Sequence, residues 1–240
     1  MATGDYLDLA THACYMAQVD PSQAADLTLA KSFVNQVYLQ TCSIPEDWDF
    51  LLKEGQVTLV AGTDSYTLTS IATALAVGTV DEVLRIVNDT VGSTPLPGMA
   101  WDALESLSSS TQDGDPMGEP LAWAKFNDRI KFYPKPSSAF AMGMLIRQRP
   151  ALMTVDAQFP LIPLQWSRAI LSHGAAALML RMESGGDALN QAQTLDADRQ
   201  QAIIDMRGSK AGGRRPTLTL QHPGFMDDPA FSYHPQGFSW

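Results

Sequence analysis

The sequence predicts an α+β protein: a helical bundle with an inserted antiparallel β domain and an extended C-terminal arm. The bundle would comprise an N-terminal helix pair and two C-terminal helices. Three observations predict this class. Apolar residues recur at spacings of three and four towards both ends of the chain, they alternate with polar residues in the middle, and the last 33 residues combine glycine, proline and aromatic residues. We expect four regions: 1–55, the N-terminal helices; 56–162, the β-rich insertion; 163–207, the C-terminal helices; and 208–240, the arm.

The first region shows the period of helices. Apolar residues over 5–18 share one helical face. Asp20-Pro21 then offers an N-cap followed by proline at the first position of a second helix, which we expect to run to about Thr41. We also expect a short helix over 46–54, closed by Gly55.

The period changes to two after Gly55. Residues 56–60 and 65–68 alternate around Gly62-Thr63-Asp64, which predicts a β-hairpin. The other elements expected before residue 121 are a strand over 80–87, a short helix over 99–107 and an exposed loop over 108–120.

Three strands at short spacing should precede the second group of helices. Asn127-Asp128 separates strands 123–126 and 129–133, which predicts a tight turn although glycine is missing. A third strand is expected over 139–147, where methionines and Ile146 alternate with other residues. Helical spacing returns at Leu164, is broken at Gly185-Gly186, and resumes in a polar helix capped by Asp187 that should run to about Arg207.

The region 208–240 cannot build a core of its own. It holds five glycines and four prolines among few aliphatic residues, yet it carries five large aromatic residues that are costly to expose to water. We expect an arm whose aromatic side chains fit pockets on another chain, the alternative being an arm folded back on its own domain. A basic patch at its start could contact phosphate or an acidic groove on a protein. The candidate partner-binding residues are Arg207, Lys210, Arg214, Arg215, Phe225, Phe231, Tyr233, Phe238 and Trp240.

Charge is distributed unevenly along the chain. Residues 1–122 hold 17 acidic and 3 basic residues, whereas residues 123–240 hold 9 acidic and 13 basic ones. Such a chain can attract copies of itself or a partner with a fixed polarity, although both surfaces could also simply be solvated. Because phosphate binding needs clustered lysine and arginine, the acidic half disfavours a nucleic-acid-binding module.

No pattern typical of catalysis or of a cofactor is present in the sequence. The four histidines lack metal-site spacing, Gly212-Gly213-Arg214-Arg215 lacks the lysine and hydroxyl residue of a P-loop, and there is no G-x-S-x-G motif. Cys14 and Cys42 are expected to be reduced, buried thiols, with a disulfide as the alternative. No apolar run approaches the roughly 18–20 residues of a membrane span, and the first residues do not resemble a secretory signal. We therefore predict a protein that is not an enzyme, binds no cofactor and does not enter a membrane.

Apolar and proline positions recur in a recognisable order over about residues 20–207. They lie in the helix pair up to Tyr38, Trp48, Val57 to Leu68, Asn127 to Pro136, Arg147, Pro150, Asp156 to Pro163 and the closing helices. This order of elements resembles that of head-to-tail adaptor (connector) proteins of tailed bacteriophages.

The resemblance implies a structural virion protein of the neck, assembled in the host cytoplasm. It would form a homo-oligomeric ring of about twelve copies that docks under the portal protein, extends the DNA channel and provides the attachment site for tail or neck proteins. DNA would pass through the lumen without specific binding, and the C-terminal arm would dock on the portal. The alternatives are a neck stopper or tail-tube ring component and, in a different class, a virion-associated hydrolase.

Overall fold

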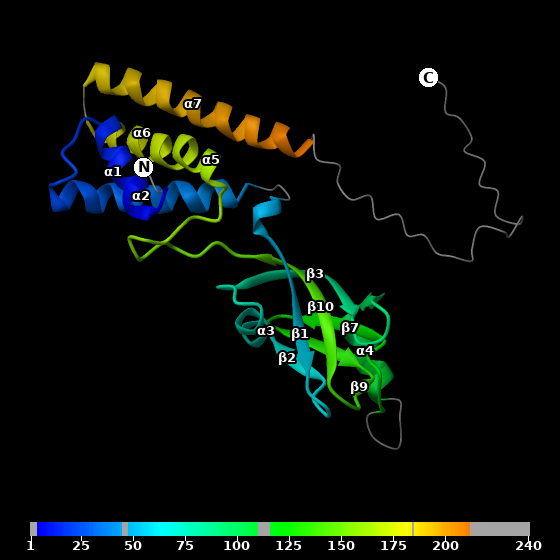
Figure 1. Cartoon of the computed structure of the whole chain (residues 1–240). Helices are drawn as coiled ribbons and strands as arrows, with labels where there is room; N and C mark the ends of the chain where they lie inside the picture. Colours follow the sequence, from blue (N-terminus) through cyan, green and yellow to red (C-terminus); the bar gives the residue numbers. More distant parts are fainter. Residues whose placement is uncertain (1–3, 45–47, 110–115, 184, 212–240) are drawn as a thin grey trace, which may run out of the picture. The chain divides into compact units, whose positions relative to one another are not determined.

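The computed structural model describes residues 4–44, 48–109, 116–183 and 185–211 (Figure 1). Its helices and sheets confirm the α+β class. The chain falls into two units, Met1–Ile203 and Ile204–Trp240, and all of the sheets lie in the first. Within the described residues, no helix is both long enough and apolar enough to cross a membrane.

Helices come from both ends of the chain, as predicted. They are α1 (Tyr6–Met16), α2 (Ala24–Cys42), α5 (Leu164–Ser167), the π-helical turn η2 (Arg168–Ser172), α6 (His173–Met182) and α7 (Gly186–Ala211). α1, α2 and α6 pack against one another in the first unit (Figure 1).

The sequence explains how these helices begin and why they pack closely. The carboxylate of Asp5 accepts a hydrogen bond from the amide of Asp8 at 2.8 Å and so caps α1. Gly174 allows α6 to approach α2, because a Cβ at this position would lie only 2.8 Å from Cγ1 of Val37. The small residue at this point therefore sets the separation of the two helices.

Two predicted helix ends are wrong. α2 begins at Ala24 rather than at Pro21, because the carboxylate of Asp20 binds the amide and the hydroxyl of Ser22 and holds a turn before the helix. α7 does not end at Arg207 but continues to Ala211, so the first four residues of the predicted arm are helical. Residues 212–240 lie outside the described residues.

The short helix predicted over 46–54 is also wrong where the structure describes it. Asp49–Leu51 form the 3₁₀ turn η1, and strand β1 (Leu52–Leu59) follows at once. Gly55 lies inside this strand, opposite Met144, and does not cap a helix. Pairing with a distant strand has overridden the local helical pattern.

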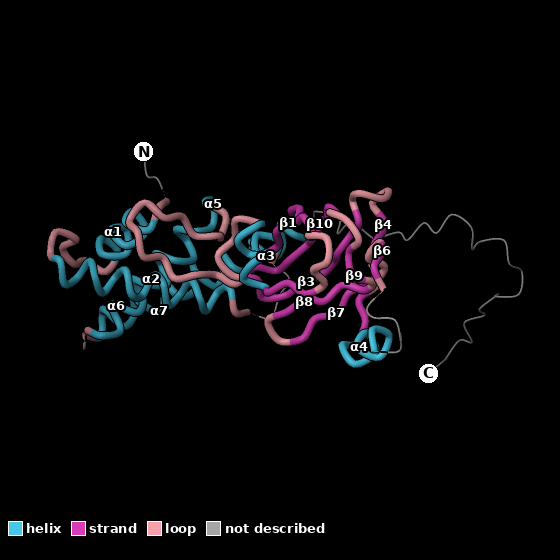
Figure 2. Tube along the Cα trace, turned by 90° about the horizontal axis from the view of Figure 1, so that it is seen from below, coloured by secondary structure: helices cyan, strands magenta, loops and turns pink. Residues whose placement is uncertain are grey.

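The middle of the chain forms two four-stranded sheets, with strand orders β1-β10-β3-β4 and β2-β8-β7-β5, and a two-stranded sheet of β6 and β9. Figure 2 shows the strands in magenta. Apart from β1, the bounds are β2 Ser65–Thr67, α3 Leu68–Ala74, β3 Val80–Asn88, β4 Thr94–Pro95, β5 Gly98–Met99, α4 Trp101–Ser109, β6 Met117–Gly118, β7 Ala122–Phe126, β8 Arg129–Tyr133, β9 Lys135–Pro136 and β10 Phe140–Gln148.

The predicted hairpin around Gly62 is wrong, because β1 and β2 belong to different sheets. The amide of Val60 donates a hydrogen bond to the Tyr66 hydroxyl at 2.6 Å, so the chain leaves the first sheet and β2 pairs with β8. The predicted turn between β7 and β8 is confirmed, and Asn127 adopts the left-handed conformation there with φ 51°. The insertion is not wholly antiparallel, since β5 pairs with β7 in parallel.

A hydrophobic core joins the two four-stranded sheets and α3. It includes Ile71 from α3, Ile86 and Met144 from the first sheet, and Ile130 and Phe132 from the second. Each is at most 1% exposed, and burying such a side chain contributes about 1.5–3 kcal/mol. This core makes the β region a rigid carrier for the side chains on its surface.

Candidate functional site

The predicted docking residues fall mostly outside the described part of the chain. Arg207 lies exposed on α7, and Lys210 belongs to the last turn of the same helix. Outside the described residues lie Arg214, Arg215, Phe225, Phe231, Tyr233, Phe238 and Trp240. The structure therefore places the start of this candidate site at the end of α7, and the grouping of the nine residues stays a prediction.

An aromatic pair on the β region forms a second candidate surface. The rings of Trp101, at the start of α4, and Phe126, at the end of β7, lie 5.5 Å apart, and Phe126 is 54% exposed. Leu104 is fully buried and anchors α4 in the fold. An exposed aromatic pair on a rigid support is typical of a protein-binding surface.

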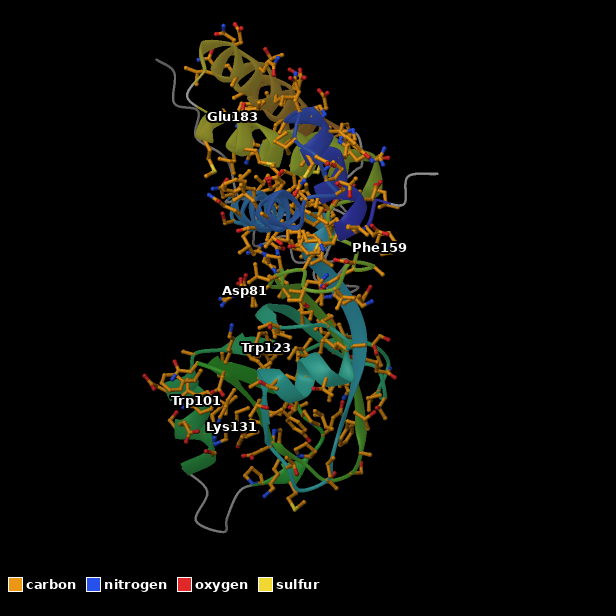
Figure 3. All side chains as sticks on the ribbon, turned by 90° about the vertical axis from the view of Figure 1, so that its left-hand side faces the viewer. Asp81, Trp101, Trp123, Lys131, Phe159 and Glu183 are labelled. Carbon is orange, nitrogen blue, oxygen red and sulfur yellow. The ribbon has the colours of Figure 1, made fainter. Side chains whose placement is uncertain are left out.

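Charged groups beside this pair fix α4 in place. The ammonium group of Lys131 donates a hydrogen bond to the carboxylate of Glu105 at 2.8 Å and lies 3.9 Å from that of Asp64. Figure 3 labels Trp101 and Lys131; the first begins α4, and the second bonds Glu105 of the same helix. Residues of α4 meet residues of β7 and β8 here, although residues 110–121 separate the helix from these two strands. Sequence periodicity therefore did not reveal the surface.

The segment before α5 presents a third candidate surface. Its backbone is tied to the start of α1, since the amides of Tyr6 and Leu7 donate to the carbonyls of Gln158 and Asp156 at 2.8 and 3.1 Å. Phe159, which is labelled in Figure 3, is nevertheless 53% exposed. An anchored loop that exposes an apolar ring is a favourable place for a contact with another protein.

A cleft of about 780 Å³ opens in the first unit between the end of α2 and the residues that follow β10. Its apolar lining includes Leu39, Cys42 and Leu152, and Arg149 at its edge forms an ion pair with Asp81 at 2.9 Å. Burial raises the pKa of the Cys42 thiol to about 12, so this group is protonated at neutral pH and unsuited to nucleophilic chemistry. The lining of the cleft therefore combines apolar and charged side chains.

Two histidines lie inside the helical packing. The rings of His12 on α1 and His173 on α6 stack with centroids 6.5 Å apart. Burial, followed by the positive charge of Arg168, lowers the pKa of His12; burial also lowers the pKa of His173, against the opposing effect of Asp198. In the described ranges, no three His, Cys, Asp or Glu residues are grouped so that they could hold a metal ion.

Comparison of the chain with known protein families identifies the family to which it belongs. The profile of a family described as SU10 adaptor protein matches residues 5–221, which includes every described element and the first ten residues after α7. A search of curated proteins found no match. The match extends further at both ends than the predicted resemblance over 20–207, and it confirms that resemblance as far as a phage adaptor. The chain therefore belongs to the SU10 adaptor protein family and is a structural adaptor of a phage.

Proposed function

We propose that this chain is a head-to-tail adaptor that docks under the portal, extends the DNA channel and provides the attachment site for the tail. The observation that carries the proposal is the match to the SU10 adaptor protein family over residues 5–221. Surfaces that would suit partner proteins support it, because the aromatic pair of Trp101 and Phe126 and the anchored loop with Phe159 both expose apolar rings.

The charge distribution supports a ring of copies. The first half of the chain carries a net charge of −14 and the second half +4. Neighbouring copies would therefore attract each other where the acidic surface of one meets the basic surface of the next. An acidic lumen would repel phosphates, so that DNA slides without a fixed partner.

The C-terminal arm would supply the contact with the portal. The proposed contact begins at Arg207 and Lys210 on α7 and continues through the basic and aromatic residues up to Trp240. Arginine and aromatic side chains are enriched at protein interfaces because they combine a large buried area with directional bonds. The basic residues would find an acidic groove on the portal, and the rings would fill its pockets.

The first test is the native mass of the full chain, alone and mixed with the portal protein of the same phage. Joint assembly into a large ring complex is the expected result. A stopper would instead bind a preformed adaptor and leave the portal alone. Absence of any complex with the portal would refute the adaptor proposal.

A second test addresses the arm. Changing Arg214→Glu and Arg215→Glu together with Phe231→Ala and Trp240→Ala should abolish portal binding, because both charge attraction and ring burial are lost. The control is Arg129→Glu with Tyr15→Ala, one exposed base and one exposed ring in the first unit. Both variants should keep the native circular dichroism spectrum. Undiminished portal binding by the arm variant would show that the arm is not the docking element.

A further inference from the structure

The two four-stranded sheets are protected unequally at their outer edges. β4 and β5 have two residues each and β2 has three, and β4 contains Pro95. Natural sheets keep edge strands short or place proline there, because unpaired backbone groups would recruit another strand. β1 is the exception: it has eight residues, pairs with β10 along its whole length, and has no second neighbour in the described part of the chain.

Strand β3, which β4 covers over only two residues, receives further hydrogen bonds from elsewhere in the chain. The amide of Leu96 donates to the carbonyl of Ile86 on β3, and the ammonium group of Lys125 donates to that of Asp81 on the same strand, both at 2.9 Å. At the start of β1, the amide of Leu52 donates to the carbonyl of Asp49. Over the rest of β1, only β10 bonds the backbone among the described residues, and other bonds resume at Val60, whose amide reaches the Tyr66 hydroxyl. Because strand residues alternate in direction, about four residues of β1 point their N–H and C=O groups away from β10.

The sequence holds a segment with the pattern of a strand just after α7. Thr217-Leu218-Thr219-Leu220-Gln221 alternates strictly between polar residues and leucine, and the match to the adaptor family ends with this segment. Pro216 precedes it, and Pro223 follows after one residue, so a strand here would be limited to about five residues. The segment lies outside the described residues, and its length fits within the eight residues of β1.

The alternation of the segment suits the two faces of β1. Val57 and Leu59 are buried on one face of the sheet, whereas Thr58 is exposed on the other. A strand added beside them would turn Leu218 and Leu220 to the buried face and Thr219 to solvent. This register places the two leucines on the same face of the sheet as the buried residues Val57 and Leu59.

The residues around the two segments carry opposite net charges, although β1 and residues 217–221 are themselves neutral. Residues 207–221 contain four basic residues and no acidic ones, whereas residues 48–96, which include β1, contain six acidic and two basic ones. Opposite charges guide the two segments together and help to fix their polarity. In a closed ring, the same contact would repeat from each copy to the next.

We propose that residues 217–221 of one copy add as a strand to the open edge of β1 in the neighbouring copy. The inference rests on the proposed ring of copies, but it does not require that the remainder of the arm contacts the portal. Backbone bonds would supply affinity, and the two leucines would supply register.

The test uses full-length chains assembled with the portal protein of the same phage. One population carries Thr58→Cys and the other carries Thr219→Cys; the native cysteines, Cys14 and Cys42, are both buried. Mild oxidation should join the two populations at least about tenfold more than when Thr94→Cys, on the opposite edge of the sheet, replaces Thr58→Cys. A chain that carries both Thr58→Cys and Thr219→Cys, diluted among unmodified chains, should form little disulfide between its own two cysteines.

Hydrogen exchange provides a second measurement with matched variants. The amides of β1 that point away from β10 should become protected on assembly of the unmodified chain. The double change Leu218→Asp and Leu220→Asp should reduce the protection factor of these amides at least about tenfold, because the contacts of two leucines with the buried face are lost. Thr217→Asp with Thr219→Asp, the same charge change on the other face of the segment, should keep it within about twofold.

Each result separates this inference from the proposed function. Portal-bound rings that show no bridge between Thr58→Cys and Thr219→Cys and no protection of β1 would overturn the strand exchange and leave the adaptor function intact. Bridges confined to single chains would overturn it as well. Bridges between copies in material that does not bind the portal would uphold the strand exchange and refute portal docking.

Discussion

The change Gly174→Ala tests how tightly α6 packs on α2. A Cβ at residue 174 would lie 2.8 and 3.1 Å from the two methyl groups of Val37 and 3.0 Å from Cδ of Arg199. Val37 is fully buried, and its branched side chain has one strongly preferred rotamer in a helix, so it cannot swing away. Overpacking of this kind costs about 1–3 kcal/mol. Replacing a helical glycine by alanine gains at most about 1 kcal/mol, so packing should win and the free energy of unfolding should fall by up to about 2 kcal/mol.

Urea unfolding followed by circular dichroism measures this change, with Gly208→Ala as the control. A Cβ at Gly208 in α7 meets no atom within 4 Å, so this variant should be neutral or more stable by up to about 1 kcal/mol. Val37→Ala should relieve the clash, and the two changes should couple by at least about 1 kcal/mol in a double-mutant cycle. If Gly174→Ala stabilises the protein as much as Gly208→Ala, the packing argument is refuted.

Two further predictions concern the core and the two partly buried histidines. Ile130→Ala should lower the unfolding free energy by about 2–5 kcal/mol, whereas Leu121→Ala, at a position 61% exposed, should change it by less than about 0.5 kcal/mol in the same urea assay. The pKa values of His12 and His173 are lowered in the folded state, so the unfolded chain binds more protons, and stability should decrease as the pH falls below about 6.5. His12 faces Asp8 and Arg168, and His173 faces Asp198. Replacing both histidines by glutamine should flatten the dependence of the urea midpoint on pH between about 5 and 7. If the slope is unchanged, the pH dependence of stability comes from other groups.

Local patterns predicted the elements better than their partners. Residues 80–87 and 129–133 are strands, and Asn127 forms the expected turn, because alternation and turn chemistry act over a few residues. Alternation shows which face of a strand is buried but says nothing about which strand lies beside it. The connection after β1 therefore suggested a hairpin, whereas β1 pairs with β10, more than eighty residues further along the chain.

The candidate site was predicted less completely than the fold. The basic and aromatic composition of the C-terminal region pointed to an arm, and seven of its nine named residues lie outside the described ranges. The pair of Trp101 and Phe126 was not predicted, because the two rings come from separate elements and meet only after the chain has folded. Gly55 was misinterpreted for a similar reason: a Cβ there would lie 2.6 Å from Cδ2 of Leu75, and this close tertiary contact leaves no trace in the local sequence.

The two proposals for the C-terminal region together predict when the ring forms. A strand of about five residues with two buried leucines is a weak contact between free copies, because association must first offset the loss of translational and rotational freedom. Once neighbouring copies are held on a portal, the segment 217–221 of one copy meets the β1 edge of the next at an effective concentration of the order of millimolar. The aromatic residues beyond Gln221 would anchor each copy, and strand exchange would then link the copies to one another. On this argument a monomer in solution agrees with both proposals, and the cross-link between Thr58→Cys and Thr219→Cys should increase sharply when the portal is added.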